Sequence, residues 1–471
     1  MKNMKDSRFP KIEVEAGVLW SEQTQRSLRN FDIGKQGFRI EFIHALVTIK
    51  RLCAVVNHAR FLLSQSHLEA IAFACEEVIS GKHNDQFPLR VWQTGSGTQT
   101  NMNVNEVITS LANGYLIRGK KKSVARDLPK IHPNDHVNMS QSTNDVFPSA
   151  MHIVVAQLSQ TLLFKAMALL EAVLNKKEAE FCTTYTVGRT HMMDALPISV
   201  GAIISAYISQ LAAARSAIEE SMRFVFQLAL GATAIGCGAN APSMFGRQVV
   251  ERLAEYYSMP FEQHSNLYAA VSGEDALLRY SSSLKQLAAV LLKIANDTRL
   301  LGSGPRCGIN EWILPANEPG SSIMPGKINP TQCKALSMVC LQVFGNDLSV
   351  SLAASSGQLQ LNTYRPLIIH NVSESIELLS DAMISFAVNT VSGLALNLKQ
   401  IESNMRNNLS AITLLAPKIG YDVAAKIVHT AEASRVSLEV AAESLGLFSK
   451  AQFESMLNEQ LKTSFSEVKS T

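Results

Sequence analysis

The stretch Gly320-Ser321-Ser322-Ile323-Met324-Pro325-Gly326-Lys327-Ile328-Asn329-Pro330 concentrates polar groups on a backbone rich in glycine and proline. Two glycines and two prolines in this short run disfavour a regular helix or a central strand. The groups that can recognise and react with an anion belong to Ser321, Ser322, Lys327 and Asn329. A solvated surface loop is the alternative, but the apolar Ile323 and Met324 favour packing over a cleft. We therefore interpret the stretch as an active-site loop.

The composition sets limits on the class of protein. A chain of 471 residues is long enough for a large core and for two or three domains. Its 43 basic and 40 acidic residues give a net charge of +3, so no global field favours nucleic acid or an anionic membrane. The seven cysteines form no CxxC pair and no metal-like spacing, which fits a reducing compartment.

Targeting and membrane signals are weak. Met1 to Glu15 is polar and carries both signs of charge, so it predicts neither a secretory signal nor a transit peptide. The uncharged stretch from Phe224 to Phe245 is interrupted by glycine, asparagine and proline, which disfavours a membrane span. We expect a cytoplasmic protein with neither nucleic acid nor membrane as a partner.

Helical periodicity dominates the pattern of apolar residues. Apolar positions recur at mostly three- and four-residue spacing from Ile153 to Val173 and from Leu284 to Ile294, where Asn296-Asp297 follows. Similar patterns begin beyond Pro330 and lie between Ile368 and Val391. Strand signals are confined to Lys11–Val14 and Arg90–Trp92. The predicted fold is mainly α, with an elongated central helical bundle.

Apolar residues nearly encircle these helices, which indicates a large bundle or burial against another subunit. We therefore expect an oligomer. The predicted domains are a mixed N-terminal domain (1–142), the central bundle (143–398) and a small helical C-terminal domain (399–471).

A second polar segment, Trp92 to Asn101, gathers hydroxyls and amides around Gly95 and Gly97. Such a segment can direct several donors at one small anion. It lacks the lysine of a Walker A motif and the glycine spacing of a Rossmann motif, so nothing in it points to a nucleotide.

A third segment, Ser140 to Asp145, precedes a helical pattern and is rich in residues that cap helices. Free N–H groups at a helix N-terminus can hold a carboxylate. Capping alone is the simpler interpretation. Upstream, His132-Pro133-Asn134-Asp135 has the composition of a turn and offers further groups to a ligand.

A fourth segment, Gly188 to Ala195, places His191 beside the hydroxyl of Thr190. Histidine titrates near neutral pH and is a natural proton carrier. A single histidine is more often structural. Four polar loops in one chain favour catalysis instead.

These segments, together with Gly304-Pro305-Arg306-Cys307-Gly308 and Asn317 to Asp347, resemble those of the class II fumarate hydratases in the fumarase/aspartase superfamily. The resemblance spans nearly the whole chain. At the N-terminus it is partial, because Gln23-Thr24-Gln25-Arg26 is retained but Ser21-Glu22 replaces the usual Gly-Ala. Aspartases typically have glutamine in place of His191, so Thr190-His191 favours fumarase.

The resemblance implies reversible hydration of fumarate to L-malate (EC 4.2.1.2), a step of the tricarboxylic acid cycle. It implies a small dicarboxylate substrate, and a homotetramer in which loops of three subunits build each active site. It implies no metal, nucleotide or redox cofactor.

Residue roles also follow from the resemblance. Ser321 is the base that removes the carbon-bound proton, and His191 transfers a proton at the leaving hydroxyl through water. Lys327 and Asn329 hold one carboxylate. The remaining contacts to substrate come from Ser96, Gly97, Thr98, Ser142, Thr143, Asn144, Thr190 and Ser322. A secondary anion site near the entrance matches His132, Pro133, Asn134 and Asp135.

The chain departs from the family pattern at Lys334, where the family has a glutamate that orients and charges the catalytic histidine. An ammonium group in that place favours neutral imidazole, whereas a carboxylate favours imidazolium. Other departures are Met139, Ala202-Ile203, Cys237, Leu267 and Ala416. Two alternatives therefore stay open: another lyase of the superfamily, such as an aspartate ammonia-lyase, or a catalytically weakened homologue with a scaffold role.

Overall fold

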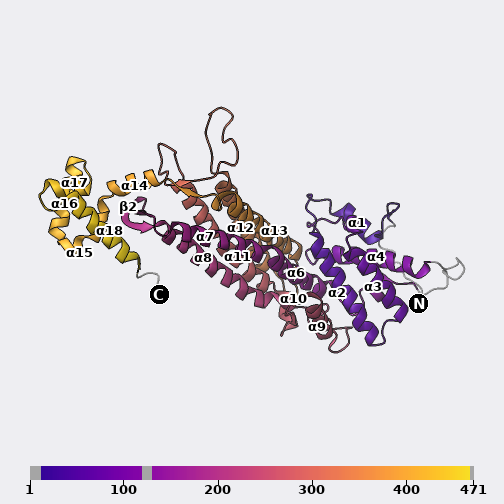
Figure 1. Cartoon of the computed structure of the whole chain (residues 1–471). Helices are drawn as coiled ribbons and strands as arrows, with labels where there is room; N and C mark the ends of the chain where they lie inside the picture. The colour runs from indigo at the N-terminus through magenta and orange to yellow at the C-terminus, as the bar shows by residue number, and fades with distance from the viewer. Residues whose placement is uncertain (1–11, 119–129, 467–471) are drawn as a thin grey trace. The chain divides into compact units, whose positions relative to one another are not determined.

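Helices make up most of the described chain in the computed structural model, which describes residues 12–118 and 130–466 (Figure 1). The strands of these residues form three two-stranded sheets. The prediction of a mainly α fold is therefore confirmed. By its internal contacts the chain divides into two compact units. Unit 1 contains Met1–Phe164, Ser216–Gln286 and Leu341–Leu378, and unit 2 contains Lys165–Arg215, Leu287–Cys340 and Leu379–Thr471.

Unit 1 begins with a group of helices that pack on one another. In chain order these are α1 (Glu22–Asn30), α2 (Ile40–Ala59), α3 (Gln65–Ile79), η1 (Asn84–Gln86), α4 (Thr98–Ile117), η2 (Pro133–Val137), α6 (Thr143–Leu158) and η3 (Ser159–Leu163). It continues with β3 (Gln227–Leu228), α9 (Phe245–Tyr257), β4 (Glu262–Gln263) and α10 (Leu267–Ser272). Side-chain caps fix several starts: Ser64 accepts from the His67 N–H at α3, and Asn266 caps α10.

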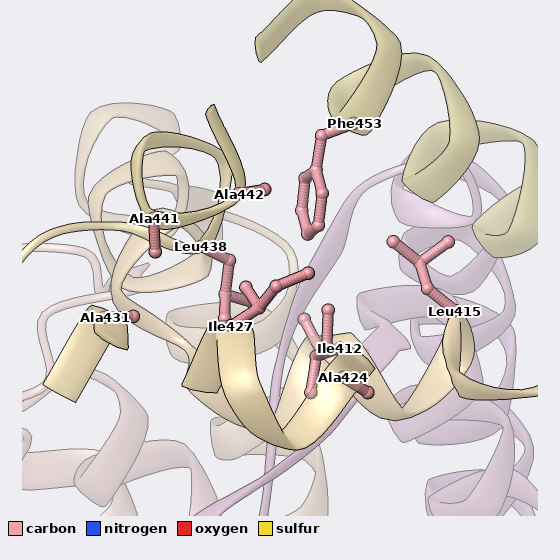
Figure 2. Close-up of a cluster of buried hydrophobic side chains, with 10 residues drawn as sticks. Ile412, Leu415, Ala424, Ile427, Ala431, Leu438, Ala441, Ala442 and Phe453 are labelled. Atoms are coloured by element: carbon pink, nitrogen blue, oxygen red, sulfur yellow. The ribbon is translucent and has the colours of Figure 1, made fainter. Parts of the chain in front are cut away.

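Unit 2 contains the longest strands and the C-terminal helices. Its elements are β1 (Tyr185–Thr190), β2 (Met193–Ser199), β5 (Trp312–Ile313), η4 (Ala387–Val391), β6 (Ala395–Leu396), α14 (Leu398–Asn407), η5 (Leu409–Leu414), α15 (Ala416–Ile419), α16 (Tyr421–Ser434), α17 (Leu438–Ser444) and α18 (Lys450–Ser466). The C-terminal helices share a core in which Ile427, Leu438 and Phe453 point toward one another (Figure 2).

Five long helices form the predicted bundle: α7 (Phe164–Phe181), α8 (Val200–Val225), α11 (Asp275–Leu301), α12 (Thr331–Ser355) and α13 (Arg365–Phe386). Polar side-chain contacts link α11 to α12 and α8 to α11. In unit 1, Ser281 of α11 donates to Asp347 of α12 over 2.8 Å. In unit 2, Tyr207 of α8 donates to Asp297 of α11 over 3.0 Å. The helix α11 continues through Asn296-Asp297 to Leu301.

The two strands predicted from the sequence are wrong among the described residues. Ile12–Val14 has no strand, and Lys11 lies outside the described residues. Arg90 forms an isolated bridge to Gly37. The Val91 N–H also donates to the Gln36 carbonyl over 2.9 Å, so this segment meets Gln36 and Gly37 without forming a regular ladder. The hairpin of β1 and β2 was missed because Gly188 and Pro197 weaken the strand signal.

Two helical stretches, Thr143–Phe181 and Thr331–Ser355, are long and apolar enough by composition to cross a membrane. Both belong to the helices described above, and the core helix of a bundle meets the same criterion. Their length alone is weak evidence for a span. The predicted domain boundaries lie close to the starts of α6 and α14, and they stay a prediction.

Glu106 fixes the first helix of unit 1. This buried carboxylate of α4 accepts from the N–H groups of Ser21, Gln23 and Thr24 and from the Thr24 hydroxyl, over 2.6–3.2 Å. It thereby satisfies donors at the N-terminus of α1 that would otherwise lack partners. Charge-assisted hydrogen bonds of this kind are stronger than neutral ones.

We predict that Glu106→Gln weakens the attachment of α1. The glutamine amide has no negative charge, and its own N–H group would face the four donors that Glu106 now accepts. Amide hydrogen exchange should show protection in α1 falling at least tenfold, which corresponds to about 1.4 kcal/mol. Glu69→Gln on the exposed face of α3 is the matched control. Unchanged protection in α1 would remove Glu106 from this role.

Candidate active site

The N-terminus of α4 presents the first polar segment. Gly97 precedes the helix with φ of 78°, and a Cβ there would lie 2.1 Å from the Phe147 ring, so only glycine fits. The hydroxyls of Ser96 and Thr98 are hydrogen-bonded to each other over 2.8 Å. Thr98 is exposed and Ser96 is buried. The loop thus holds two hydroxyls at the positive end of a helix dipole.

The N-terminus of α6 presents the second segment. Ser142 caps the helix by accepting from the Asn144 N–H over 3.2 Å, and its own N–H donates to Asp145 over 3.0 Å. The second oxygen of Asp145 accepts from Gly231 and Thr233. Burial raises the pKa of Asp145 to about 6, while these hydrogen bonds oppose the rise. The capping predicted from the sequence is confirmed. The backbone N–H groups of the first turn that the cap does not use are the donors that can bind an anion.

These two helix starts lie together. The Asn101 amide donates to the Thr143 hydroxyl over 2.8 Å, and Phe147 of α6 packs against Gly97. Two positive helix ends therefore meet at one place in unit 1. We call Ser96–Thr98 with Ser142–Asn144 the anion seat. The structure brings together all six residues of this set that the sequence assigned to substrate.

Arg365, at the start of α13, supports the anion seat from behind and was missed by sequence reasoning. Its guanidinium donates to Glu274 over 2.6 Å, to the Asn144 carbonyl over 3.0 Å and to the Val271 carbonyl over 2.8 Å. Its backbone N–H donates to Gly95. Both charged side chains are buried, and burial raises the pKa of Glu274 against the pull of Arg365. No sequence signal pairs residues so far apart in the chain.

Lys50 of α2 is a second residue that the sequence analysis missed. Its side chain is fully buried and its ammonium donates to Asn138 over 3.1 Å and to Gln141 over 3.3 Å. Asn138 also accepts from Asn101, which holds Thr143. Burial lowers the pKa of Lys50 to about 8. A lysine at a buried position of an apolar helix is a signal that could have identified it.

The predicted secondary site lies in η2, also in unit 1. His132, Asn134 and Asp135 are exposed, and Pro133 is half-buried. The ring of His132 accepts from the N–H groups of Asn134 and Asp135 over 3.3 and 3.2 Å. Asn113 of α4 fixes the preceding residue through both backbone groups of Ile131. The segment is one short π-helical element capped by His132, where the sequence indicated a turn, and its exposed side chains are accessible to an anion.

His191 lies at the tip of the hairpin formed by β1 and β2 in unit 2. Thr190 pairs with Met193, so His191 and Met192 form a two-residue turn. Their φ angles are 55° and 65°, and both residues are exposed. A turn of this shape suits glycine or asparagine, so a histidine here is strained. Strain at an exposed histidine is a feature of functional sites.

The loop that opened the sequence analysis lies over an open cleft of about 410 Å³ in unit 2. The cleft is lined in part by Ser321, Met324 and Lys327. The Asn329 amide donates to the Gly320 carbonyl over 2.6 Å, which closes the base of the loop. Ile323 is 82% exposed, so it does not pack over the cleft within one chain.

The hydroxyl of Ser321 accepts from the N–H groups of Ile323 and Met324, each over 3.2 Å. Ser322 and Lys327 are exposed, as is Lys334 in the first turn of α12. Across the residues that the structure describes, no hydrogen bond joins this loop to the His191 hairpin. Among the same residues, no three His, Cys, Asp or Glu side chains form a group that could hold a metal ion.

Comparisons with known proteins identify the family. Residues 10–345 match the family model described as Lyase, and residues 412–460 match that of the Fumarase C C-terminus. Fumarate hydratase class II of Thermosynechococcus vestitus is 48% identical over 94% of each chain. The protein of the same name from Prochlorococcus marinus is 47% identical over 96% of each chain. The chain belongs to the class II fumarate hydratase family.

Solved structures agree with the class II fumarate hydratase assignment. The class II fumarase of Schistosoma mansoni has a TM-score of 0.89 and 41% identity, covering 95% of this chain and 96% of its own. A fumarate lyase:delta crystallin structure from Brucella melitensis bound to cobalt has a TM-score of 0.90 and 37% identity, covering 96% and 97%. The chain is therefore a lyase, and the family resemblance found in its sequence is confirmed.

We predict that the anion seat of this class II fumarate hydratase binds dicarboxylates more weakly above pH 8. Lys50 then loses its proton, and with it the positive charge and a donor behind the seat. Succinate binding, measured by calorimetry from pH 7 to 9, should weaken by about fivefold, or about 1 kcal/mol. The nearby Cys53 and Cys75 stay neutral there because burial raises the pKa of each thiol, and Asp145 is already ionised.

Lys50→Met should remove this pH dependence, whereas Lys82→Met at an exposed position should keep it. The role of Lys50 would be contradicted by flat binding in the wild-type protein or by the same pH dependence in Lys50→Met.

Proposed function

We propose that this chain catalyses the reversible addition of water to fumarate, giving L-malate, in the tricarboxylic acid cycle. The observation that carries the proposal is the anion seat, where the starts of α4 and α6 meet in a chain whose relatives are named fumarate hydratases. Converging helix N-termini and hydroxyls suit the carboxylate of a small diacid.

The difficult step is removal of a proton from the carbon beside a carboxylate. The negative charge that develops spreads onto that carboxylate and must be stabilised where it appears. Ser321 is the proposed base. Serine is a weak base at its ordinary pKa and needs activation, and the two backbone N–H groups that it accepts would stabilise its alkoxide.

His191 is the proposed proton carrier for the leaving hydroxyl, acting through a water. Its exposure at the hairpin tip leaves the imidazole free to reach that water. Lys327 and Asn329 hold one carboxylate. Thr190, Ser322 and the anion seat supply the remaining hydrogen bonds, and His132 to Asp135 form the secondary site. The reaction moves a proton and a hydroxide without electron transfer, so it requires no redox cofactor.

The exposed face of α12 supports a homotetramer as the working form. One face of the helix carries four apolar side chains that are 59–61% exposed and follow one another at steps of three, seven and four residues: Met338, Leu341, Leu348 and Leu352. Gly345 lies on the same face with open space beside it. An apolar helix face with this spacing packs against a second helix in coiled coils. The proposal is that further copies of this chain cover it and complete each active site.

We also propose that the enzyme works in the cytoplasm on a free dicarboxylate. All seven cysteines are free thiols, as expected in a reducing compartment.

The direct test is turnover with malate, fumarate and aspartate side by side, followed by ultraviolet absorbance of fumarate. We expect malate and fumarate to interconvert at about 1 to 10³ per second, with no ammonia released from aspartate. Ser321→Ala should lower turnover by at least about a hundredfold while the oligomer stays intact. Turnover of aspartate alone would identify another lyase of the superfamily, and substantial activity in Ser321→Ala would remove the serine from the base role.

Lys334 favours one competing function, a catalytically weakened homologue retained as a scaffold. It is exposed in the first turn of α12, where the family pattern has a glutamate. If no activity is found with either fumarate or malate in the intact wild-type oligomer, this alternative replaces the enzyme proposal.

The charge of Lys334 generates its own prediction. Lys334→Glu should shift the pH profile of kcat, because the charge that residue 334 offers to the proposed proton carrier His191 changes sign. Lys334→Gln should give an intermediate profile. Three superimposable profiles would mean that Lys334 does not act on His191.

A further inference from the structure

The tip of the hairpin that carries His191 has a strained backbone, and its side chains are exposed. His191 and Met192 both have positive φ, and Met192 is 64% exposed. Neither side chain gains packing within the described chain that could offset the backbone strain. The turn must therefore be held by contacts elsewhere in the hairpin.

An ion pair at the base of the turn supplies such a contact. Arg189, two residues before His191 in β1, donates from its two terminal nitrogens to the two oxygens of Glu311, over 2.7 and 3.1 Å. The Glu311 side chain is fully buried, and that of Arg189 is 18% exposed. A bidentate guanidinium–carboxylate pair fixes direction as well as distance.

Further contacts connect this pair to unit 2. The Asn404 amide of α14 donates to Glu311 over 2.8 Å. The backbone of Glu311 accepts from the Asn397 N–H and donates to the Leu301 carbonyl. Glu311 is therefore fixed by contacts to the end of α11 and to α14. Through its ion pair with Arg189 it fixes β1 relative to these two helices.

The other strand of the hairpin is held by Asn408, which follows α14, and by Ser410 of η5. Asn408 donates to the Ala195 carbonyl over 2.9 Å, and Ser410 donates to the Asp194 carbonyl over 3.2 Å. Both strands thus carry fixed contacts within three residues of the turn, at Arg189, Asp194 and Ala195. The tip itself has no such contact among the described residues.

Stability alone is a poor explanation for a buried ion pair, because well-packed apolar residues often stabilise as much or more. What a bidentate pair provides is a defined geometry. Proton transfer needs that geometry, since displacement by about 1 Å can cost about a hundredfold in rate.

We propose that Glu311 and Asn404 are positioning residues for His191, acting through Arg189 to hold the strained turn in its productive orientation. The inference rests on the proposed function, in which His191 carries the proton. It gives the segment around α14 a role in catalysis although it supplies no group to the substrate.

The test compares Glu311→Gln and Asn404→Ala with the wild-type oligomer in turnover and in amide exchange of residues 190–193. We expect kcat to fall about ten- to a hundredfold in Glu311→Gln, and less in Asn404→Ala, with KM changed by less than about threefold. Exchange at the turn should accelerate in both variants. Glu459→Gln, which breaks the exposed pair with Lys418, is the matched control and should change neither quantity.

A double-mutant cycle separates positioning from general destabilisation. If Glu311 acts through His191, Glu311→Gln should cause no further loss of kcat in a His191→Ala background. An additive loss, or slow exchange at the turn in Glu311→Gln, would overturn the proposal. If His191→Ala itself retains wild-type kcat, the proposed role of His191 fails, and the exchange data still show whether Glu311 holds the turn.

Discussion

The hydrogen bond from Asn101 to Thr143 joins the starts of α4 and α6, and the account of the site depends on this junction. Two helix N-termini that face the same point would repel each other's positive ends without an anion or a fixed polar link. The link is part of a buried network, since Asn138 accepts from both Asn101 and Lys50. The network places donors before the substrate arrives, so little reorganisation is needed when charge develops.

A binding seat of this kind does not complete a catalyst. The proposed base and the proposed proton carrier lie in unit 2, on an open loop and at the tip of a hairpin. Both segments are exposed within one chain, as is the apolar face of α12. Association between copies of the chain would explain why the two catalytic segments and the apolar face of α12 are all exposed in a single chain. Neighbouring copies would then cover these exposed groups and exclude water from them.

The sequence predicted the helical class because apolar spacing is a local property. The cap at Ser142 and the polar loop at Gly320 to Pro330 were equally readable, since capping residues and glycine–proline runs act on their immediate neighbours. Arg365 with Glu274 and Arg189 with Glu311 could not be found in this way. Each pair joins residues about a hundred positions apart, and only the folded chain selects which buried charges meet.

The strand errors have a related cause. Arg90–Trp92 has the residues of a strand but forms only an isolated bridge to Gly37, whereas β1 and β2 pair despite Gly188 and Pro197. Whether a segment forms a strand depends on the neighbouring strand available to it as well as on its own residues. The strained turn at His191 likewise contradicts local preference, and departures of this kind are expected where a site requires an unusual geometry.

The central claim is that the anion seat of one copy acts with the Ser321 loop of another. It is tested most directly by mixing two inactive variants, Asn144→Ala and Ser321→Ala, under conditions that exchange subunits, and then measuring fumarate hydration. The account predicts that the mixture regains a readily measured part of the wild-type turnover, because some sites receive an intact seat and an intact loop from different copies. A mixture no more active than its separate components, with subunit exchange verified, would contradict it.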